Sequence, residues 1–233
     1  MKKLSLLLSM SLPMFVFGQK NASIEVSTGL NYTDYSNKIS NSEGRLNYDF
    51  GMAMTIPTKR TNREWVMGLR FTAYGDKSKI SGLRWGSQHD GMGGWNPSAP
   101  SLEDVSGFES KSNLFYIELP VAYRIYVLTG KTRLFVQANA GPSIYLTYRN
   151  ANTTSYGDGT SQTTVQTGYD DNFRKLNAMA GLSMGVEIPV SDKLRILLQP
   201  HGQMQLLSIA SNSETGAKWY AFGLRAGLRY RLF

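Results

Sequence analysis

The chain contains no cysteine among its 233 residues. This absence excludes disulfide frameworks, thiolate zinc sites and thiol nucleophiles. Histidine is also scarce: His89 and His201 are the only two, and a metal site would need more ligands at closer spacing. Aromatic residues make up 12% and charged residues 18% of the chain, and this composition argues against disorder.

Long apolar runs are missing as well. No run after the N-terminus approaches the roughly 18 residues that a spanning helix needs, and the mean hydropathy is −0.29. The one apolar stretch, residues 4–17, follows Lys2 and Lys3, is broken by Pro13 and precedes small Gly18. This arrangement predicts a cleaved signal peptide over residues 1–18 and an exported domain over residues 19–233. No cysteine follows the expected cleavage site, which excludes a bacterial lipid anchor.

Strict alternation of apolar and polar residues dominates the remaining chain. Ile24 and Val26, for example, alternate with Ser23, Glu25 and Ser27. Such a period of two requires an extended strand with one apolar face. Eight strands are expected, at residues 22–32, 46–56, 64–73, 115–125, 134–148, 176–188, 194–206 and 220–232.

The segments between these strands alternate in length. Short turns are expected at residues 57–63, 128–132 and 189–193, and long polar loops at residues 33–45, 75–112, 149–174 and 210–217. Long loops at one end and short periplasmic turns at the other are typical of outer-membrane barrels. The sequence therefore predicts an all-β fold, an eight-stranded antiparallel up-and-down transmembrane β-barrel with both termini in the periplasm.

Two assignments of the strand faces are possible. In a soluble lipocalin-like barrel the apolar set would point inward, and in a membrane barrel it would point to lipid. The second is favoured because aromatic residues of the apolar set fall near both strand ends, where amphipathic rings prefer the membrane interface. These interfacial aromatics are Tyr32, Tyr48, Tyr148 and Tyr220 near the long loops, and Trp65, Tyr123 and Tyr230 near the short turns.

The polar set then lies in the lumen of a barrel only wide enough for side chains. Its charged members are Glu25, Asp49, Glu64, Arg70, Glu118, Arg124, Glu187, Arg195, Arg225, Arg229 and Arg231. Buried charges must pair and form hydrogen bonds. We expect an ion-pair network that fills the lumen, and a gated ion path through rearranging pairs is the alternative.

Three prolines fall inside expected strands. Pro120, Pro142 and Pro200 each remove a donor from the ladder of hydrogen bonds, and a closed barrel has no free edge to accommodate them. We therefore expect bulges there, or strands that pair over only part of their length.

Three segments resemble a known family. The stretch FYIELPVAYRIY at residues 115–126 resembles the Tyr-Leu-x-Ile-Pro strand of the outer-membrane β-barrel family abundant in Bacteroidota, also called the porin or PorT family. FVQANAGPSIYL at residues 135–146 and LNAMAGLSMGVEI at residues 176–188 are similar to its following strands. The resemblance implies an eight-stranded barrel in the outer membrane and would explain Pro120, but it implies little about activity.

Candidates for chemistry are few. His201 is expected in the lumen among Gln199, Gln203 and Gln205, as a hydrogen-bonded residue. The chain shows no motif of barrel proteases or lipid A-modifying enzymes, so no enzyme and no catalytic residue is predicted. Asp158, Asp170 and Asp171 could bind Ca²⁺, but their irregular spacing favours a solvated loop. No metal or other cofactor is expected.

The longest expected loop carries Trp85, Trp95 and Phe108. Exposed aromatics on a surface loop suggest a binding tip for a glycan or protein, and a loop that buries its own aromatics over the barrel mouth is the alternative. Basic residues are spread along the strands, which argues against nucleic-acid binding. Outer-membrane lipid, lipopolysaccharide and the barrel-assembly machinery are the expected partners, together with an extracellular or envelope protein.

Three functions remain open. The first is a non-enzymatic barrel that presents surface loops for binding or supports an envelope or secretion complex. The second is a porin for small solutes or ions, and the third is a soluble periplasmic ligand binder of the lipocalin type.

Overall fold

The computed structural model describes residues 22–36, 42–85, 105–210 and 216–232, with no side-chain description for residues 82–85. No helix in this part of the chain is long and apolar enough to cross a membrane. Residues 1–18, the expected signal peptide, lie outside the described residues, so their cleavage stays a prediction.

The described residues form ten β-strands, each antiparallel to its partners. The strands are β1 (Ser23–Tyr35), β2 (Ser42–Pro57), β3 (Arg63–Trp85), β4 (Val105–Glu118), β5 (Val121–Thr129), β6 (Arg133–Tyr156), β7 (Ser161–Gly168), β8 (Leu176–Pro189), β9 (Leu194–Gln205) and β10 (Trp219–Arg231).

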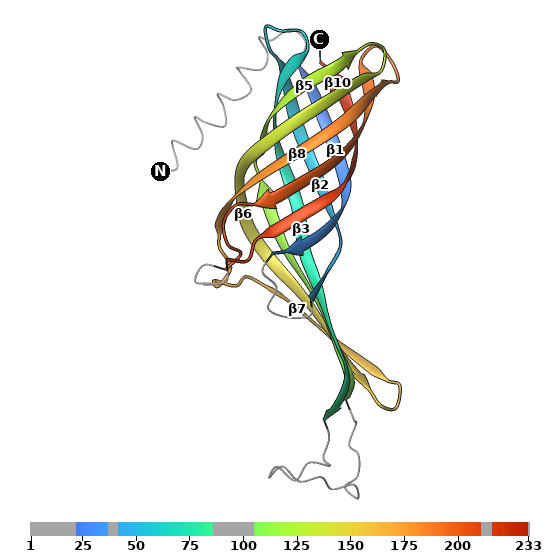
Figure 1. Cartoon of the computed structure of the whole chain (residues 1–233), viewed down its shortest axis with the longest axis vertical. Coiled ribbons are helices and arrows are strands. Elements are labelled where there is room, and N and C mark those ends of the chain that lie inside the picture. The colour runs from blue at the N-terminus through green and yellow to red at the C-terminus, as the bar shows by residue number, and fades with distance from the viewer. Residues whose placement is uncertain (1–21, 37–41, 86–104, 211–215, 233) are drawn as a thin grey trace, which may run out of the picture.

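The strands close into a ring of eight (Figure 1). Strands β4 and β5 share one position between β3 and β6, so nine strands occupy the eight positions of the ring, and β7 lies outside it, paired among the described residues with β6. The ring closes where β1 pairs with β10, from Ser23 opposite Arg231 to Tyr35 opposite Trp219. The predicted eight-stranded antiparallel barrel is confirmed.

The two ends of the barrel differ. One end carries the tight connections from Pro57 to Arg63, from Thr129 to Arg133 and from Pro189 to Leu194, and we call it the short-turn end. The amide of Leu232 donates to the carbonyl of Ala22 at 2.9 Å, which places the beginning and end of the described chain there together.

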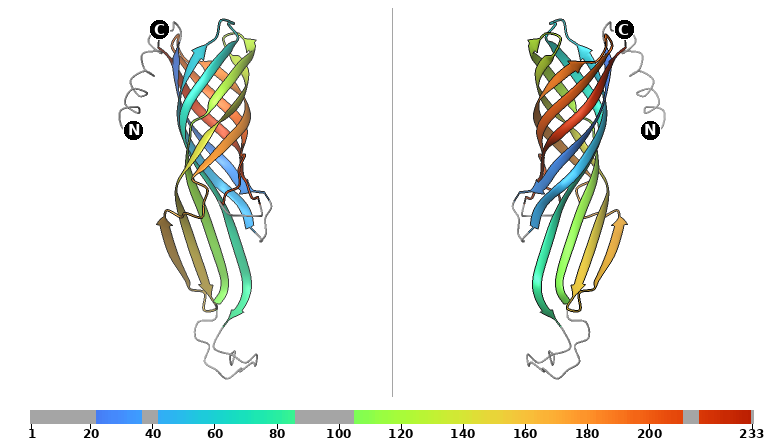
Figure 2. Two further views of the ribbon diagram at one scale, coloured as in Figure 1. Left: turned by 90° about the vertical axis from the view of Figure 1, so that its left-hand side faces the viewer. Right: turned by 90° about the vertical axis from the view of Figure 1, so that its right-hand side faces the viewer.

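Three strands continue well beyond the opposite end and are joined there by β7 in a twisted sheet (Figures 1 and 2). We call this sheet the arm: residues 76–85 of β3, 105–112 of β4, 150–156 of β6, and β7, in the order β3-β4-β6-β7. The expectation of long loops over residues 75–112 and 149–174 is wrong for the residues of the arm, which form strands. The arm is solvated on both faces, so apolar and polar residues do not alternate along its strands. Their Ser, Thr and Asn content resembles that of a loop.

The outer surface of the barrel is apolar, as the alternation predicts. The side chains of Leu30, Leu46, Leu182 and Leu224 are each more than half exposed. The interleaved residues point inward and are buried, among them Glu25, Asp49, Glu118, Arg124, Glu187 and Arg225. This arrangement is the inverse of a soluble barrel, whose apolar set would fill the interior.

The prolines interrupt pairing where they were expected to. The strand stops after Glu118 and resumes at Val121, so Pro120 separates β4 from β5. Pro142 lies beside this break, where its carbonyl accepts from the amide of Leu119 at 3.0 Å. At Pro200 the β8–β9 pairs jump from Ser183–His201 to Val186–Leu198. Each proline thus sits where the ladder is locally incomplete.

Candidate functional site

The lumen contains a cluster of charges close to the short-turn end, which we call the Arg124 layer. Arg124 of β5 holds Glu25 of β1 through two bonds, with Nη1–Oε1 at 2.6 Å and Nη2–Oε2 at 2.9 Å. Arg229 of β10 holds Glu64 of β3 in the same way, at 2.8 and 2.7 Å. Planar two-bond contacts of this kind are the strongest form of ion pair in proteins. They tie together strands from opposite sides of the ring.

A third carboxylate completes this layer. Glu187 Oε1 lies 2.7 Å from Arg229 Nη1 and 3.2 Å from Arg124 Nη1. The hydroxyl of Tyr126 lies 2.6 Å from Glu187 Oε1 and 2.7 Å from Glu64 Oε1. All six side chains are buried. The layer therefore contains three carboxylates and two guanidiniums at a point where water is largely excluded.

A second charged cluster, the Arg225 layer, lies nearer the middle of the barrel. The guanidinium Nε of Arg225 donates to both oxygens of Asp49, at 2.9 and 3.1 Å, and Asn31 Nδ2 donates to Asp49 at 2.7 Å. Arg225 Nη2 and Arg70 Nη1 both donate to Gln203 Oε1, at 2.8 and 3.0 Å.

Glu118 connects this layer to the next one. Its Oε2 lies 3.7 Å from Arg70 Nη1 and accepts from the Thr72 hydroxyl at 3.0 Å. Its Oε1 accepts from the hydroxyl of Tyr74 at 2.8 Å. Arg70 and Arg225 balance Asp49 and Glu118, so the Arg225 layer is formally neutral.

Aromatic side chains fill the lumen next to the arm. The rings of Tyr74 and Tyr116 meet edge to face at 5.6 Å, and Tyr74 stacks on Trp219 at 6.0 Å. Tyr145 packs against Tyr116 at 5.7 Å. Leu114, Ile209 and Ala221 complete the buried cluster. These residues lie on β3, β4, β6, β10 and the segment after β9, so the aromatic layer crosses the whole opening.

The structure places the expected lumen residues as follows. Glu25, Asp49, Glu64, Glu118, Arg124, Glu187, Arg225 and Arg229 are all buried and lie in the two charged layers, and Arg70 joins them with a side chain 11% exposed. Arg195 is only half-buried and donates to the carbonyl of Lys131 at 3.2 Å, at the mouth of the short-turn end. Arg231 is exposed at the same mouth and was wrongly expected inside, because β10 ends there.

Several residues that face the lumen were not predicted from the sequence. Tyr126 joins the Arg124 layer, and Phe135 lies under the Arg124 guanidinium at 4.2 Å. Tyr74 and Tyr116 form the aromatic layer. Their position in the alternation could have identified Tyr126 and Tyr74, which follow Arg124 and Thr72 by two residues. They were overlooked because aromatic residues were expected only on the outer face.

His201 and the acidic groups were considered as sites for chemistry. His201 is buried, its Nε2 lies 3.8 Å from Asp49 Oδ2, and neither ring nitrogen forms a hydrogen bond within the described chain. It does not fit the expected hydrogen-bonded role. His89 lies outside the described residues.

In the described residues, one group could offer three ligands to a metal ion: Glu25, Glu64 and Glu187, with oxygens within 4.8 Å of one another. Arg124 and Arg229 already hold all three carboxylates. A divalent cation would have to displace these guanidiniums, so the trio does not fit a resident metal ion.

The three aspartates considered for Ca²⁺ are used separately. Asp158 Oδ1 accepts from the amide of Thr160 at 2.8 Å, and Asp170 Oδ1 accepts from the amide of Asn172 at 2.9 Å. Asp171 pairs with Lys175 at 2.7 Å. Each therefore shapes its own turn, and they do not form a common site.

The interfacial aromatics lie mostly on the outside. Tyr32, Tyr48, Trp65 and Tyr230 are each between 44% and 50% exposed. Trp65 and Tyr123 are cross-strand neighbours with ring centroids 4.9 Å apart, and Tyr220 contacts Phe222 at 5.8 Å.

Tyr148 differs from this set and corrects the expectation. It packs against Phe173 at 6.4 Å and belongs to the border of the aromatic layer. The pairing of β4 with β6 shifts between Phe115–Thr147 and Tyr116–Tyr145, so a bulge reverses the facing of residues beyond it.

The arm contains the expected loop aromatics only in part. Phe108 lies in β4 opposite Ile80, so it is in a strand and not in a loop. Trp85 is the last residue of β3, and its side chain is outside the description, as is the whole of Trp95.

Charged residues stabilise one side of the arm. Glu109 of β4 forms ion pairs with Lys111 and, at 3.5 Å, with Lys77 of β3. Its hydrogen bond with Lys111, followed by the charges of both lysines, holds the pKa of Glu109 below its ordinary value. Lys77 and Lys111 face each other across the strands, so the carboxylate separates two like charges.

The opposite edge of the arm is uncharged. Strand β7 reads Ser-Gln-Thr-Thr-Val-Gln-Thr-Gly, and within the described ranges it pairs with β6 on one side only. Residues 161–167 are all exposed, and Val165 is 49% exposed. Edge strands usually carry charges or prolines that prevent pairing with other strands. The β7 edge has neither.

Comparisons with known proteins agree with this architecture. The family model described as "Outer membrane protein beta-barrel domain" matches residues 17–209. A search of curated proteins finds no match.

Solved structures with a similar chain course include Neisserial surface protein A (11% identity, TM-score 0.42, covering 91% of this chain and 97% of that one). The attachment invasion locus protein of Yersinia pestis (9% identity, TM-score 0.40) covers 91% of this chain and 99% of its own. The outer membrane protease OmpT of Escherichia coli (8% identity, TM-score 0.45) covers 92% and 98%.

Proposed function

This chain belongs to the outer membrane protein β-barrel domain family. On that premise we propose that it is a non-enzymatic barrel that presents the arm for binding at the cell surface. Its lumen is closed by its own side chains. Membership places the protein in the outer membrane, where the apolar outer surface of the barrel contacts lipid. The short-turn end, with both termini, then faces the periplasm, and the arm faces outward.

The β7 edge is the observation that carries this proposal. Unpaired backbone N–H and C=O groups along an uncharged strand are available to a strand from another molecule. The opposite edge of the arm is different, because β3 carries Lys79 there, just beyond its last printed pair with β2 at Ser78. Three strands that continue from the barrel, β3, β4 and β6, carry the arm with its β7 edge beyond the end of the barrel (Figure 2). A protein ligand with an exposed strand is the partner that fits this edge.

The layers in the lumen support a closed barrel. Two ion-pair layers and one aromatic layer, each made of buried side chains from opposite sides of the ring, follow one another along the axis. An ion passing through would have to separate bidentate pairs inside a low-dielectric interior, which costs several kcal/mol. The closed lumen favours a binding role over a porin. The sequence carries no motif of barrel proteases or lipid A-modifying enzymes, which supports a non-enzymatic protein.

Attachment of intact cells tests the binding role. Cells expressing the full chain are compared with cells whose chain lacks residues 157–168, on surfaces coated with protein or with polysaccharide. The proposal expects attachment to protein that is lost without β7. The matched pair is Gln166→Lys on the β7 edge, which should reduce attachment, and Ser106→Lys on the inner strand β4, which should not. Equal attachment by all four chains would contradict the proposal.

Assignment to the PorT branch of the family is a finer proposal. It rests on the segment at residues 115–126, whose Pro120 divides β4 from β5. Contacts with lipopolysaccharide at the rim, with the assembly machinery and with an envelope complex are likewise proposals that follow from the location in the outer membrane.

A further inference from the structure

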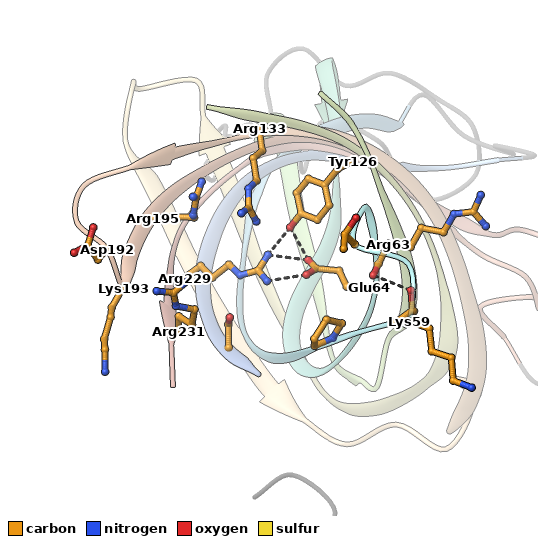
Figure 3. A pocket seen from close by; sticks show the side chains of 14 residues that line it. Lys59, Arg63, Glu64, Tyr126, Arg133, Asp192, Lys193, Arg195, Arg229 and Arg231 are labelled. Carbon is orange, nitrogen blue, oxygen red and sulfur yellow. Dashed lines mark hydrogen bonds and ion pairs between the residues drawn. The ribbon is translucent and has the colours of Figure 1, made fainter. Parts of the chain in front are cut away.

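A cavity of about 610 Å³ opens at the short-turn end, and we call it the vestibule (Figure 3). Its walls come from the ends of β2, β3, β6, β9 and β10 and the turns between them. Its floor is the Arg124 layer, because Glu64, Tyr126 and Arg229 line both. Sites for small molecules commonly have volumes of this order.

The vestibule is strongly basic. Seven of its fourteen lining residues are lysine or arginine, and only Glu64 and Asp192 are acidic. Glu64 is already held by Arg229 through two bonds. Asp192 is exposed in the turn before β9, and Figure 3 shows its side chain turned away from the cavity. The acidic groups of the walls therefore leave most of the positive charge uncompensated.

Three arginines, Arg133, Arg195 and Arg229, face the cavity and lie close to one another. Arg195 and Arg229 are directly opposite on the paired strands β9 and β10, which places like charges side by side. Arg133 extends over the ring of Tyr126 at 5.5 Å. Figure 3 shows the guanidiniums of all three turned toward the same space. Arg229 is compensated by Glu64 and Glu187 in the Arg124 layer, so the charges that an anion in this space would meet are those of Arg133 and Arg195.

Neither Arg133 nor Arg195 has an acidic partner. Within the described part of the chain, no carboxylate lies at ion-pairing distance from either guanidinium. Glu187 is opposite Arg133 in the β6–β8 ladder, yet its bonds go to Arg124 and Arg229. The two guanidiniums thus keep free donors in a concave, partly shielded site.

We propose that the vestibule binds a small anion with at least two oxyanion groups, either carboxylates or phosphates, held by Arg133 and Arg195 above the Arg124 layer. A planar guanidinium forms two parallel bonds with a carboxylate or a phosphate, and two such forks facing one space favour a ligand with two such groups. The ligand would also reduce the repulsion between Arg133 and Arg195, whose charges act on each other. This site lies at the opposite end from the arm and is independent of the proposed function.

Calorimetric titration with citrate and with pyrophosphate tests the site on the full mature chain folded in zwitterionic micelles. The two probes distinguish a carboxylate ligand from a phosphate ligand, and acetate serves as the single-charge comparison. We expect one of the two probes to bind, and acetate to bind more weakly. Arg133→Gln and Arg195→Gln should each weaken the binding about tenfold, because each removes charged hydrogen bonds.

Arg63→Gln is the matched control. Arg63 lines the same rim, but Figure 3 shows its side chain pointing away, and its Nη1 lies 3.5 Å from the Tyr123 hydroxyl. This variant should bind within twofold of the unmodified chain. Folding of each variant is checked by its shift on an unboiled gel, and Arg195→Gln should fold well because Arg195 is only half-buried and holds no carboxylate among the described residues. Absence of binding by both probes, or equal weakening in all three variants, would overturn the proposal.

Discussion

Arg225 and Asp49 form an ion pair across an intervening strand, and a glycine makes that contact possible. Gly29 of β1 is paired with Arg225 on one side and with Asp49 on the other. A Cβ atom at Gly29 would lie 2.8 Å from Arg225 Cγ and 2.9 Å from Asp49 Oδ1. The missing side chain therefore leaves the space in which strands β2 and β10 are joined over β1.

Gly29→Ala is the first prediction. The added methyl group must push apart the Arg225–Asp49 pair, and overpacking of this kind costs about 1–3 kcal/mol. Unfolding in urea from lipid vesicles measures the loss. Gly168→Ala is the control, because the nearest atom to its Cβ would be 3.6 Å away on Tyr148, an ordinary contact. Equal stability of the two variants would contradict the role of Gly29.

Arg124→Gln is the second prediction. The change leaves Glu25 without its two-bond partner in a buried site, and breaking such a pair costs about 3–5 kcal/mol. Arg60→Gln, in the exposed turn between β2 and β3, is the control and should change stability by less than about 0.5 kcal/mol. A cycle with Glu25→Gln should recover part of the loss, since the double variant no longer buries that unpaired carboxylate.

The third prediction concerns conduction. The two ion-pair layers and the aromatic layer close the lumen, so the purified protein should give no steady openings in a planar bilayer. A wide porin in the same bilayers is the positive control. Steady, ohmic openings at neutral pH would show that the layers leave a path and would favour the porin alternative.

The fourth prediction is a pH dependence of the arm. Lys111 and Lys77 lower the pKa of Glu109, so the folded arm binds fewer protons there than the unfolded arm. This contribution to stability is complete above the ordinary value of 4.5 and is lost as the pH falls through the lowered pKa. The protection factors of arm amides in β3 and β4, which are exchange rates corrected for the slower chemical exchange at low pH, should therefore fall on acidification below pH 4.5. Glu109→Gln should remove this dependence, and an unchanged dependence would assign it to other groups.

The sequence predicted the barrel well because alternation is a local property. Each strand displays its own two faces, so the outward set, such as Leu30 and Leu182, could be assigned without knowing its neighbours. The pairing of Arg124 with Glu25 could not be predicted. It joins residues 99 positions apart and depends on the stagger of the strands around the ring.

The arm and the vestibule were missed for different reasons. The arm is solvated on both faces, so its strands carry no apolar period, and the sheet continues there by pairing alone. The vestibule depends on Arg133 and Arg195, which lie near the starts of β6 and β9 after different turns and come together on the two sides of β8. Tyr148 was misplaced because one bulge reversed the alternation.

Cysteine labelling of intact cells tests most directly the claim that the arm lies at the cell surface. The chain has no native cysteine, so only the introduced thiol can react. Thr164→Cys lies on the exposed β7 edge, and Asp192→Cys lies in the exposed turn between β8 and β9. With a maleimide that does not cross membranes, we predict labelling of Thr164→Cys on intact cells and of Asp192→Cys only after the outer membrane is permeabilised. Labelling of Asp192→Cys but not Thr164→Cys on intact cells would contradict a barrel that presents its arm at the cell surface.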